Sequence, residues 1–334
     1  MTGETGRIEK TPCLLATAPN KVECRERVTE ALGAGQVRIK VELTMVSTGT
    51  ELHHIQQTHT KKMAYPFSTG YISVGRVVGA APDAVNATMG QRVLVQHGHA
   101  AYHNVAAATL KPIPEGVESV DAAAAILLGI AIRGIRGGQV HIGDSVAVFG
   151  LGVIGQYAVH LAKIAGAYPV IAVDPVARRR EVAKQMGADV VLDPLSQDAP
   201  AEIRKQTMNG EGARVAIDAS GTPRVIATLP DVTAPFGRVV VLGGVHGLVP
   251  FDLYTRFQKS NLTMVGCGSP YPSDYPYDND DRNILALLDM MNAKMVRPRP
   301  VVSHFVPWRE APEMYRMLIE EKDKAIGVAF DWRA

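Results

Sequence analysis

Three glycines with the spacing of a dinucleotide-binding turn stand directly after a short apolar run at residues 146–149. Gly150 would permit the tight turn, Gly152 would let the backbone approach a pyrophosphate, and Gly155 would let the following helix pack closely on the strand. Between residues 153 and 165 the apolar side chains recur every three or four positions, as on one face of a helix. The pattern therefore predicts a strand, a glycine turn and a helix whose N-terminus meets phosphate.

An acidic residue completes this predicted unit. The next expected strand, residues 169–173, ends at Asp174, roughly 20 residues after the glycines, where a carboxylate accepts hydrogen bonds from an adenosine ribose. A tight turn that binds nothing is the alternative, but strand, helix, second strand and acid in register favour a cofactor site. We expect NAD rather than NADP, because Asp174 would repel a 2′-phosphate.

Polar side chains gather in residues 48–69, which lack clean periodicity and are expected to form a loop or short helices. Histidines recur in this stretch and in a later one: His53, His54, His59, His97, His99 and His103. Their spacings do not fit a helical zinc pair, and few carboxylates lie nearby, so surface histidines are favoured over a metal site. Tyr71 is either a general acid or a core residue, and Glu51 is expected to be a structural hydrogen-bond acceptor rather than a base.

Length and composition bound the fold and the partners. A chain of 334 residues exceeds one comfortable core and predicts two domains. A net charge of +2 argues against nucleic acid as a partner, and three cysteines without CxxC spacing favour a reducing compartment. The apolar stretch at 122–135 is too short to span a bilayer and no signal peptide is recognised, so a cytoplasmic protein without membrane contact is expected.

The elements expected along the chain divide into a β part and an α/β part. In the first part, strands are predicted at residues 13–17, 37–43, 73–78, 91–96 and 107–112. A helix at 122–135 is followed by strands at 146–149, 169–173, 190–192, 214–217, 238–242 and 262–265, with helices at 153–165, 177–186, 201–207 and 222–229 between them. This alternation predicts an α/β fold with a doubly wound parallel sheet. In the tail, helices are expected at 284–291 and 310–320, and strand-like runs at 301–305 and 326–330.

Three stretches together resemble the medium-chain dehydrogenase/reductase superfamily: residues 46–53, the unit at 146–174, and 217–221 with 237–244. The resemblance implies a GroES-like β catalytic domain built from residues 1–125 and 269–334, a Rossmann NAD-binding domain at 126–268, and a cleft between them. It also implies further cofactor-binding residues, at Val153, Ile154, Arg179, Ala219, Gly243 and Val245.

The metal-binding residues of zinc-dependent relatives do not carry over. Thr48 replaces a cysteine, the Gly-Tyr-Ile sequence at 70–72 replaces Gly-His-Glu, and Ala125 or a neighbour stands at the third ligand, so zinc would be bound poorly. The four-cysteine structural lobe is also missing. The resemblance places Thr50 at the family's proton-relay hydroxyl and His53 at its relay histidine, with Tyr71 in place of a metal ligand. The sequences of residues 47–51 and 68–75 are similar to those of zinc-lacking members, among them the bacteriochlorophyllide a dehydrogenases.

These features together favour an NAD-dependent, zinc-independent oxidoreductase that oxidises a secondary hydroxyl of a polyhydroxylated or ring substrate, such as a sugar or cyclitol. A quinone or enone reductase using NAD(P)H, or a cofactor-binding protein without turnover, are the alternatives. The resemblance further implies a homodimer or homotetramer that pairs through strand 262–265. Residues 269–278, rich in aromatics and proline, are interpreted as a substrate lid, a subunit contact or an ordered surface loop.

Overall fold

The chain folds into two compact units in a computed structural model that describes residues 3–268 and 279–334. Unit 1 contains Met1–Ala125 and Val302–Ala334, and unit 2 contains Ile126–Val301. The predicted α/β class is confirmed by the mixture of helices and sheets. The segment 269–278, interpreted above as a lid or contact, lies outside the described residues.

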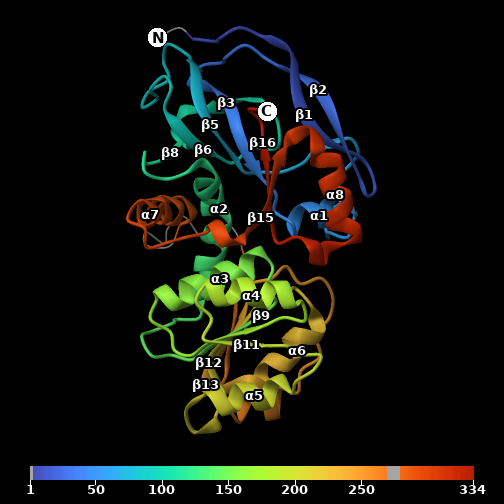
Figure 1. The fold of residues 1–334 in the computed structure, drawn as a ribbon, viewed down its shortest axis with the longest axis vertical. Coiled ribbons are helices and arrows are strands. Elements are labelled where there is room, and N and C mark those ends of the chain that lie inside the picture. The colour runs from blue at the N-terminus through green and yellow to red at the C-terminus, as the bar shows by residue number, and fades with distance from the viewer. Residues whose placement is uncertain (1–2, 269–278) are drawn as a thin grey trace. The chain divides into compact units, whose positions relative to one another are not determined.

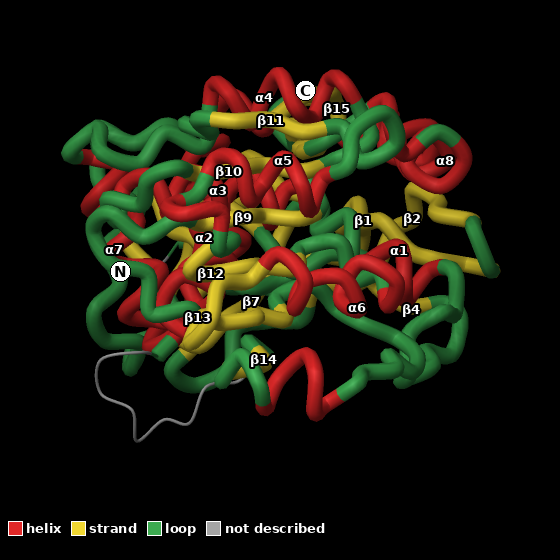
Figure 2. Tube along the Cα trace, turned by 90° about the horizontal axis from the view of Figure 1, so that it is seen from below, coloured by secondary structure: helices red, strands yellow, loops and turns green. Residues whose placement is uncertain are grey.

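The described residues of unit 2 form the predicted parallel sheet, in the order β11-β10-β9-β12-β13-β14 (Figure 2). The strands are β9 (Val146–Phe149), β10 (Val170–Val173), β11 (Val190–Leu192), β12 (Ala213–Asp218), β13 (Thr233–Val241) and β14 (Thr263–Gly266). Every residue of β9 and β10 is buried, because each of these central strands has neighbours on both edges and cover on both faces. The strand order reverses direction between β9 and β12, which is where such sheets bind ligands.

Helices connect these strands and cover the sheet. They are α2 (Ser119–Gly137), which begins in unit 1, then α3 (Val153–Ile164), α4 (Ala177–Gln185), α5 (Ala199–Gln206), α6 (Pro223–Val232) and α7 (Asp280–Asn292). Helix α3 contacts α4, and α5 contacts α6 (Figure 1). Right-handed crossovers on either side of the reversal place these two pairs on opposite faces of the sheet.

Helix α7 corrects the expected domain boundary. Residues 269–334 were expected to return together to the first domain, yet α7 belongs to unit 2. The guanidinium group of Arg133 on α2 donates to both carboxylate oxygens of Asp280, at 3.0 and 2.7 Å. Ile284 is buried, and a Cβ added to Gly129 of α2 would lie 3.4 Å from its side chain. The apolar face of α7 thus has its partner in α2, and only residues from Val302 onward join unit 1.

Unit 1 is built from two β-sheets, ordered β2-β1-β4 and β15-β16-β3-β5-β6-β8, with β7 also paired to β3. The strands are β1 (Ile8–Ala18), β2 (Lys21–Thr29), β3 (Gln36–Met45), β4 (Phe67–Ser68), β5 (Ser73–Ala80), β6 (Arg92–Val95), β7 (Tyr102–Ala106), β8 (Lys111–Pro112), β15 (Val302–Pro307) and β16 (Gly327–Asp331). The strand expected at 107–112 is instead a 3-10 turn at Ala107–Thr109 followed by the short β8. The chain's last strands therefore complete a sheet that its first strands begin.

Two helices hold the polar segment of unit 1 in place. Helix α1 (Thr50–Ile55) buries Ile55 in the same apolar cluster as Tyr315 and Leu318 of α8 (Ala311–Glu320). This short helix lies within the stretch 48–69 that was expected to hold a loop or short helices. It fixes the directions in which the candidate catalytic side chains point. Over residues 3–268 and 279–334, no helix has both the length and the apolar character needed to cross a bilayer.

Candidate active site

The glycine turn of unit 2 is packed so tightly that two of its glycines cannot carry side chains. Gly150 has φ +88°, and a Cβ added there would lie 2.7 Å from the backbone of Ser220. A Cβ on Gly155 would lie 1.8 Å from the carbonyl oxygen of Gly150. At Gly152, in contrast, an added Cβ meets no atom of the described residues within 4 Å. The backbone at Gly152 is therefore open to a ligand, while the other two glycines hold the turn and the helix together.

Asp174 lies at the carboxyl end of β10 beside this turn and is only 3% exposed. Its carboxylate accepts hydrogen bonds from the backbone N–H groups of Leu151, at 2.7 Å, and Val176, at 2.8 Å. Arg179 lies 3.7 Å from the same carboxylate. Each carboxylate oxygen has a second lone pair, so both can still accept a bond from a ribose hydroxyl. The acid and Arg179 thus lie close together at the end of β10, where the adenosine ribose is expected.

Asp218, at the end of β12, ties together the loops on the other side of the strand reversal. Its side chain accepts hydrogen bonds from the Ser220 backbone (3.0 Å) and hydroxyl (2.6 Å) and from the Gly221 N–H (3.2 Å). Its carbonyl accepts from the Gly243 N–H at 2.8 Å. Burial raises the pKa of Asp218, against the lowering effect of these donors. Asp218 was not among the expected site residues, although a polar acid at the end of a buried strand is a signal that sequence reasoning can use.

The remaining expected cofactor residues lie along these same loops. Val153 is buried at the start of α3, while Ile154 is half-buried beside it. Ala219 donates its N–H to the Phe149 carbonyl at 2.8 Å, which fixes the β12 loop to the end of β9. Val245 is half-buried after β13. Unit 2 therefore brings the expected dinucleotide residues to the carboxyl ends of its central strands.

A cavity of about 200 Å³ in unit 1 brings together two of the three expected catalytic residues, Thr50 and Tyr71. Its lining also includes Glu51, His54, Met63, Phe67, Ser68, Thr69 and Gly70. The side chains come from α1 and from the segment that leads through β4 towards β5. The cavity thus presents hydroxyl, phenol and imidazole groups together with the apolar faces of Met63 and Phe67.

A buried network supports one wall of this cavity. The Tyr71 hydroxyl donates to the Ser47 hydroxyl at 2.7 Å, and the Ser47 N–H donates to Glu51 at 2.6 Å. The other carboxylate oxygen of Glu51 lies 3.2 Å from His99 Nε2 and accepts from the Tyr315 hydroxyl. Burial and the adjacent Glu51 carboxylate raise the pKa of Tyr315 well above its usual value. As expected from the sequence, Glu51 is a structural hydrogen-bond acceptor.

The two adjacent histidines of α1 have different surroundings. His53 is half-buried, its Nδ1 lies 2.7 Å from the Thr58 hydroxyl, and it is not one of the described residues that line the cavity. His54 does line the cavity, and its Nδ1 is buried without a hydrogen-bond partner among the described residues. The ring of His54 stacks on that of His59, with the centroids 4.2 Å apart. Sequence reasoning missed His54 as a site residue, although its position four residues after Thr50 places both on one side of a helix.

The residues at the family's metal positions do not fit zinc. Thr48 offers only a neutral hydroxyl, and the phenol of Tyr71 is already engaged with Ser47. Zinc in proteins prefers thiolate, imidazole and carboxylate ligands. Within 3–268 and 279–334, no cluster of three or more histidine, cysteine or acidic side chains is arranged to hold a metal ion.

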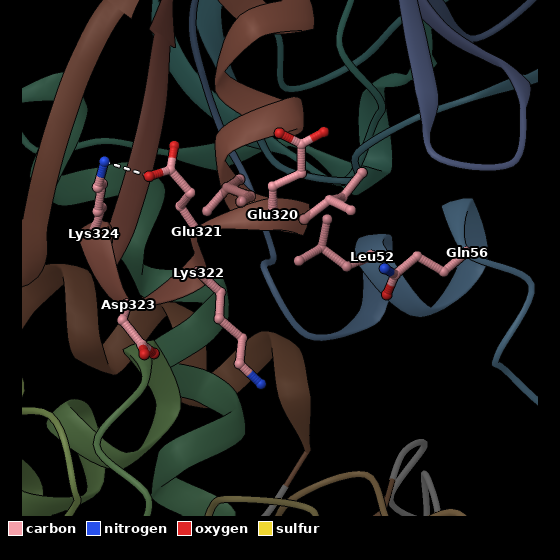
Figure 3. A pocket seen from close by; sticks show the side chains of 9 residues that line it. Leu52, Gln56, Glu320, Glu321, Lys322, Asp323 and Lys324 are labelled. Carbon is pink, nitrogen blue, oxygen red and sulfur yellow. Dashed lines mark ion pairs between the residues drawn. The ribbon is translucent and has the colours of Figure 1, made fainter.

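A second cavity, of about 450 Å³, opens on the other side of α1 (Figure 3). Leu52 and Gln56 of α1 face the segment 318–324 across it. The charged groups of that segment have partners of their own, since Lys324 pairs with Glu321 and Glu320 pairs with Arg316 at 2.8 Å. Thr50 and Tyr71 line the smaller cavity, and none of the three expected catalytic residues is among the described residues that line this one.

Comparison with known proteins identifies dehydrogenases. A family model for zinc-binding dehydrogenases matches residues 153–280. The chain is 27% identical to D-guloside 3-dehydrogenase of Escherichia coli over 351 residues, covering 95% of this chain and 99% of that protein. It is 28% identical to L-threonine 3-dehydrogenase of Pyrococcus horikoshii over 291 residues, covering 77% of this chain and 83% of the relative.

Solved structures share the fold over nearly the full length. A Sinorhizobium meliloti protein described as a zinc-binding dehydrogenase, bound to NADP, superposes with a TM-score of 0.85 at 19% identity, covering 97% of this chain and 100% of that one. A short chain alcohol dehydrogenase of E. coli CFT073, complexed with NADH, gives a TM-score of 0.83 at 21% identity, with coverage of 97% and 100%. The stretch matched by the family model contains neither Thr48 nor Tyr71, so its description does not bear on the metal positions of unit 1.

Proposed function

We propose that this chain oxidises a secondary hydroxyl of a polyhydroxylated or ring substrate with NAD and without zinc. It belongs to the medium-chain dehydrogenase/reductase superfamily and is a nicotinamide-dependent dehydrogenase of CH–OH donors. The observation that carries this proposal is the cavity of unit 1, in which the Thr50 hydroxyl and the His54 imidazole share the lining with Tyr71, which stands in place of a metal ligand. Several hydrogen-bonding groups in one small cavity suit a hydroxylated molecule better than a simple alkanol or quinone.

The position of Asp174 supports NAD as the cofactor. Its buried carboxylate sits at the end of β10, where a 2′-phosphate would meet a negative charge. The glycine turn would hold the pyrophosphate, and the loops that Asp218 ties together would pass beside the nicotinamide end. The bound dinucleotide supplies the hydride acceptor. Because one structural relative binds NADP and another NADH, the preference of this chain has to be measured directly.

Holding the alkoxide is the task that zinc performs in other members, since a metal lowers the pKa of a bound alcohol. In this chain the Thr50 hydroxyl would donate to the oxygen as its charge develops. Tyr71 would be a second donor to the same oxygen by turning its single O–H away from Ser47. Hydrogen-bond donors placed where the charge develops can supply part of what the metal would. The proton then passes to an imidazole of α1, where His53 occupies the family's relay position.

The relatives support the substrate class without fixing the substrate. They are named for position 3 of a D-guloside and of L-threonine. We therefore expect a small hydroxylated molecule, acted on at a secondary carbon.

The test is a substrate panel with both cofactors. The purified enzyme is assayed for reduction of NAD and of NADP with alkyl D-gulosides, L-threonine, alditols and cyclitols, and for NADH oxidation with quinones and enones. We expect NAD reduction with at least one hydroxylated compound. Activity confined to quinones or enones would favour the reductase alternative, and tight NAD binding without any turnover would favour a cofactor-binding protein. One equivalent of zinc, with activity lost to a chelator and restored by the metal, would contradict the metal-free mechanism.

Thr50→Val tests the alkoxide donor within the same assay. General acid-base assistance contributes about 10²–10⁴ in rate, so we expect turnover to fall by about 10² or more. The affinity for NAD should change little, because Thr50 belongs to unit 1 and the dinucleotide residues to unit 2. Thr60→Val is the matched control, since Thr60 is exposed and is not among the described residues that line the cavity.

We also propose a homodimer or homotetramer, formed through β14. This strand pairs with β13 and is the last in the sheet order, and three of its residues, Thr263, Met264 and Gly266, are exposed. An exposed apolar edge invites pairing with a second copy. Light scattering at micromolar concentration should report a dimer or tetramer, and Met264→Lys should shift it towards monomer. A monomeric wild-type protein would refute the proposal.

A further inference from the structure

Helix α1 turns neighbouring residues in different directions, because each step along an α-helix rotates the side chain by about 100°. Three pairs four residues apart each share a side: Thr50 with His54, Glu51 with Ile55, and Leu52 with Gln56. The first pair lines the cavity of about 200 Å³, the second is buried with Glu51 also reaching the wall of that cavity, and the third lines the cavity of about 450 Å³. His53 falls between two of these sides and bonds to Thr58. The histidine that shares the cavity with Thr50 is therefore His54.

His54 is equipped to accept a proton inside the cavity. His54 lines the cavity, and its buried Nδ1 has no hydrogen-bond partner among the described residues, so no other group holds the ring through that nitrogen. The charged and titratable groups around the ring are His53 and Glu51 on α1, His59 stacked on it, and Lys61 in the following segment. Burial lowers the pKa of His54, the three basic neighbours lower it further, and only Glu51 raises it. The ring is consequently neutral at pH 7, as a base must be.

We infer that the imidazole of His54, rather than that of His53, accepts the proton of the substrate hydroxyl during oxidation. The inference rests on the proposed function and deepens it by naming the base. With a bound nicotinamide taking the hydride from the carbinol carbon, the O–H bond would break, its proton would move to a ring nitrogen of His54, and the carbonyl double bond would form. Thr50, on the same side of α1, donates to that oxygen throughout. In the reverse direction, protonated His54 returns the proton to the carbonyl oxygen.

The experiment compares His54→Gln with His53→Gln in the full-length enzyme, using the compound of the panel that wild type oxidises fastest. Turnover number and KM are measured from pH 5.5 to 9, and the Kd for NADH is measured by its own fluorescence. We expect His54→Gln to lower turnover by about 10² or more and to remove the rise of activity with pH. His53→Gln should retain that rise of activity with pH. Neither change should alter the Kd for NADH, because both residues lie in unit 1.

A third variant separates proton transfer from a structural role. His54→Ala leaves space in the cavity, so added imidazole should restore part of its activity in proportion to the neutral form of the buffer. A misfolded variant would not respond in this way.

The outcomes distinguish the inference from the function on which it rests. An active wild type, with His54→Gln as active as His53→Gln and with the same pH profile, would overturn the role of His54 alone. Loss of the pH dependence in His53→Gln, with the pH dependence kept in His54→Gln, would identify His53 as the group that accepts the proton. A wild type that oxidises no hydroxylated compound with either cofactor would refute the proposed function and this inference together.

Discussion

The imidazole of His103 should make unit 1 sensitive to acid. It lies on β7, is 2% exposed, and has partners on both ring nitrogens. Arg27 can only donate, so Nδ1, 3.0 Å from its guanidinium nitrogen, is the acceptor. Nε2 then carries the hydrogen and donates to the Gly98 carbonyl at 2.8 Å. A second proton would have to sit between the ring and a cation. Burial, followed by His97 and Arg27, accordingly lowers the pKa of His103 to about 3.

The expected magnitude follows from the difference between the folded and unfolded states. The unfolded chain takes up this proton as the pH falls through 6.5, while the folded chain does not do so until about pH 3. The lowered pKa therefore contributes stability that is present above pH 6.5 and is lost progressively between 6.5 and 3. Between pH 7 and pH 5 the linkage relation gives a loss of about 2 kcal/mol from His103. This figure depends little on the folded-state pKa as long as that value lies well below 5.

The assay is urea unfolding at pH 7 and at pH 5, followed by tryptophan fluorescence. Both tryptophans of the chain, Trp308 and Trp332, stack on each other in the core of unit 1, so their signal reports this unit. His103→Asn keeps an acceptor for Arg27 but cannot titrate, and it should lose about 2 kcal/mol less than wild type between the two pH values. His304→Asn, which removes a half-buried imidazole of the same unit, should behave as wild type. Equal losses in wild type and His103→Asn would show that the buried ring is protonated and would refute the reasoning.

Three further changes test other parts of the molecule. Asp174→Ser removes the charge facing the ribose and should raise the ratio of NADP to NAD efficiency at least tenfold, about 1.4 kcal/mol; a wild type that already prefers NADP would contradict this. Gly155→Ala would force a Cβ to 1.8 Å from a backbone carbonyl, so NADH binding and the melting temperature should both fall, while Gly152→Ala should weaken binding only. Tyr315→Phe deletes the buried donor to Glu51 and should cost about 1.5–3 kcal/mol in the same tryptophan-monitored unfolding, with unchanged stability as the refuting result.

The sheet of unit 2 could be predicted from the sequence almost in full. Its central strands are apolar at every position, and turn residues separate them from amphipathic helices, so the type and the order of these elements could both be predicted. The glycine turn could also be predicted, for a related reason. Close contacts such as that of Gly155 exclude every side chain, and the sequence records that exclusion as glycine.

Unit 1 was harder to predict, because its strands depend on partners that are distant in the sequence. Strand β2 carries charged residues on much of its length and pairs with β1, so no apolar alternation marked it. Strand β7 pairs with β3, far earlier in the chain. The tail was misassigned at α7 for the converse reason. Its amphipathic pattern predicted a helix, but the pattern did not indicate that this helix would pack against α2.

Family resemblance and local geometry select different histidines of α1 as the proton acceptor, His53 and His54 respectively. Resemblance aligns positions along the chain and so selected His53, whereas the cavity is lined according to direction around α1. Adjacent residues of a helix point about 100° apart, and in α1 the shift from His54 to His53 exchanges a side chain that lines the cavity for one that does not. The sequence left the stretch 48–69 open between a loop and short helices, and in a loop the two histidines could not have been ranked. Once α1 begins at Thr50, the four-residue interval places His54 on the same side of the helix, and His54 is the imidazole that lines the cavity together with the proposed alkoxide donor.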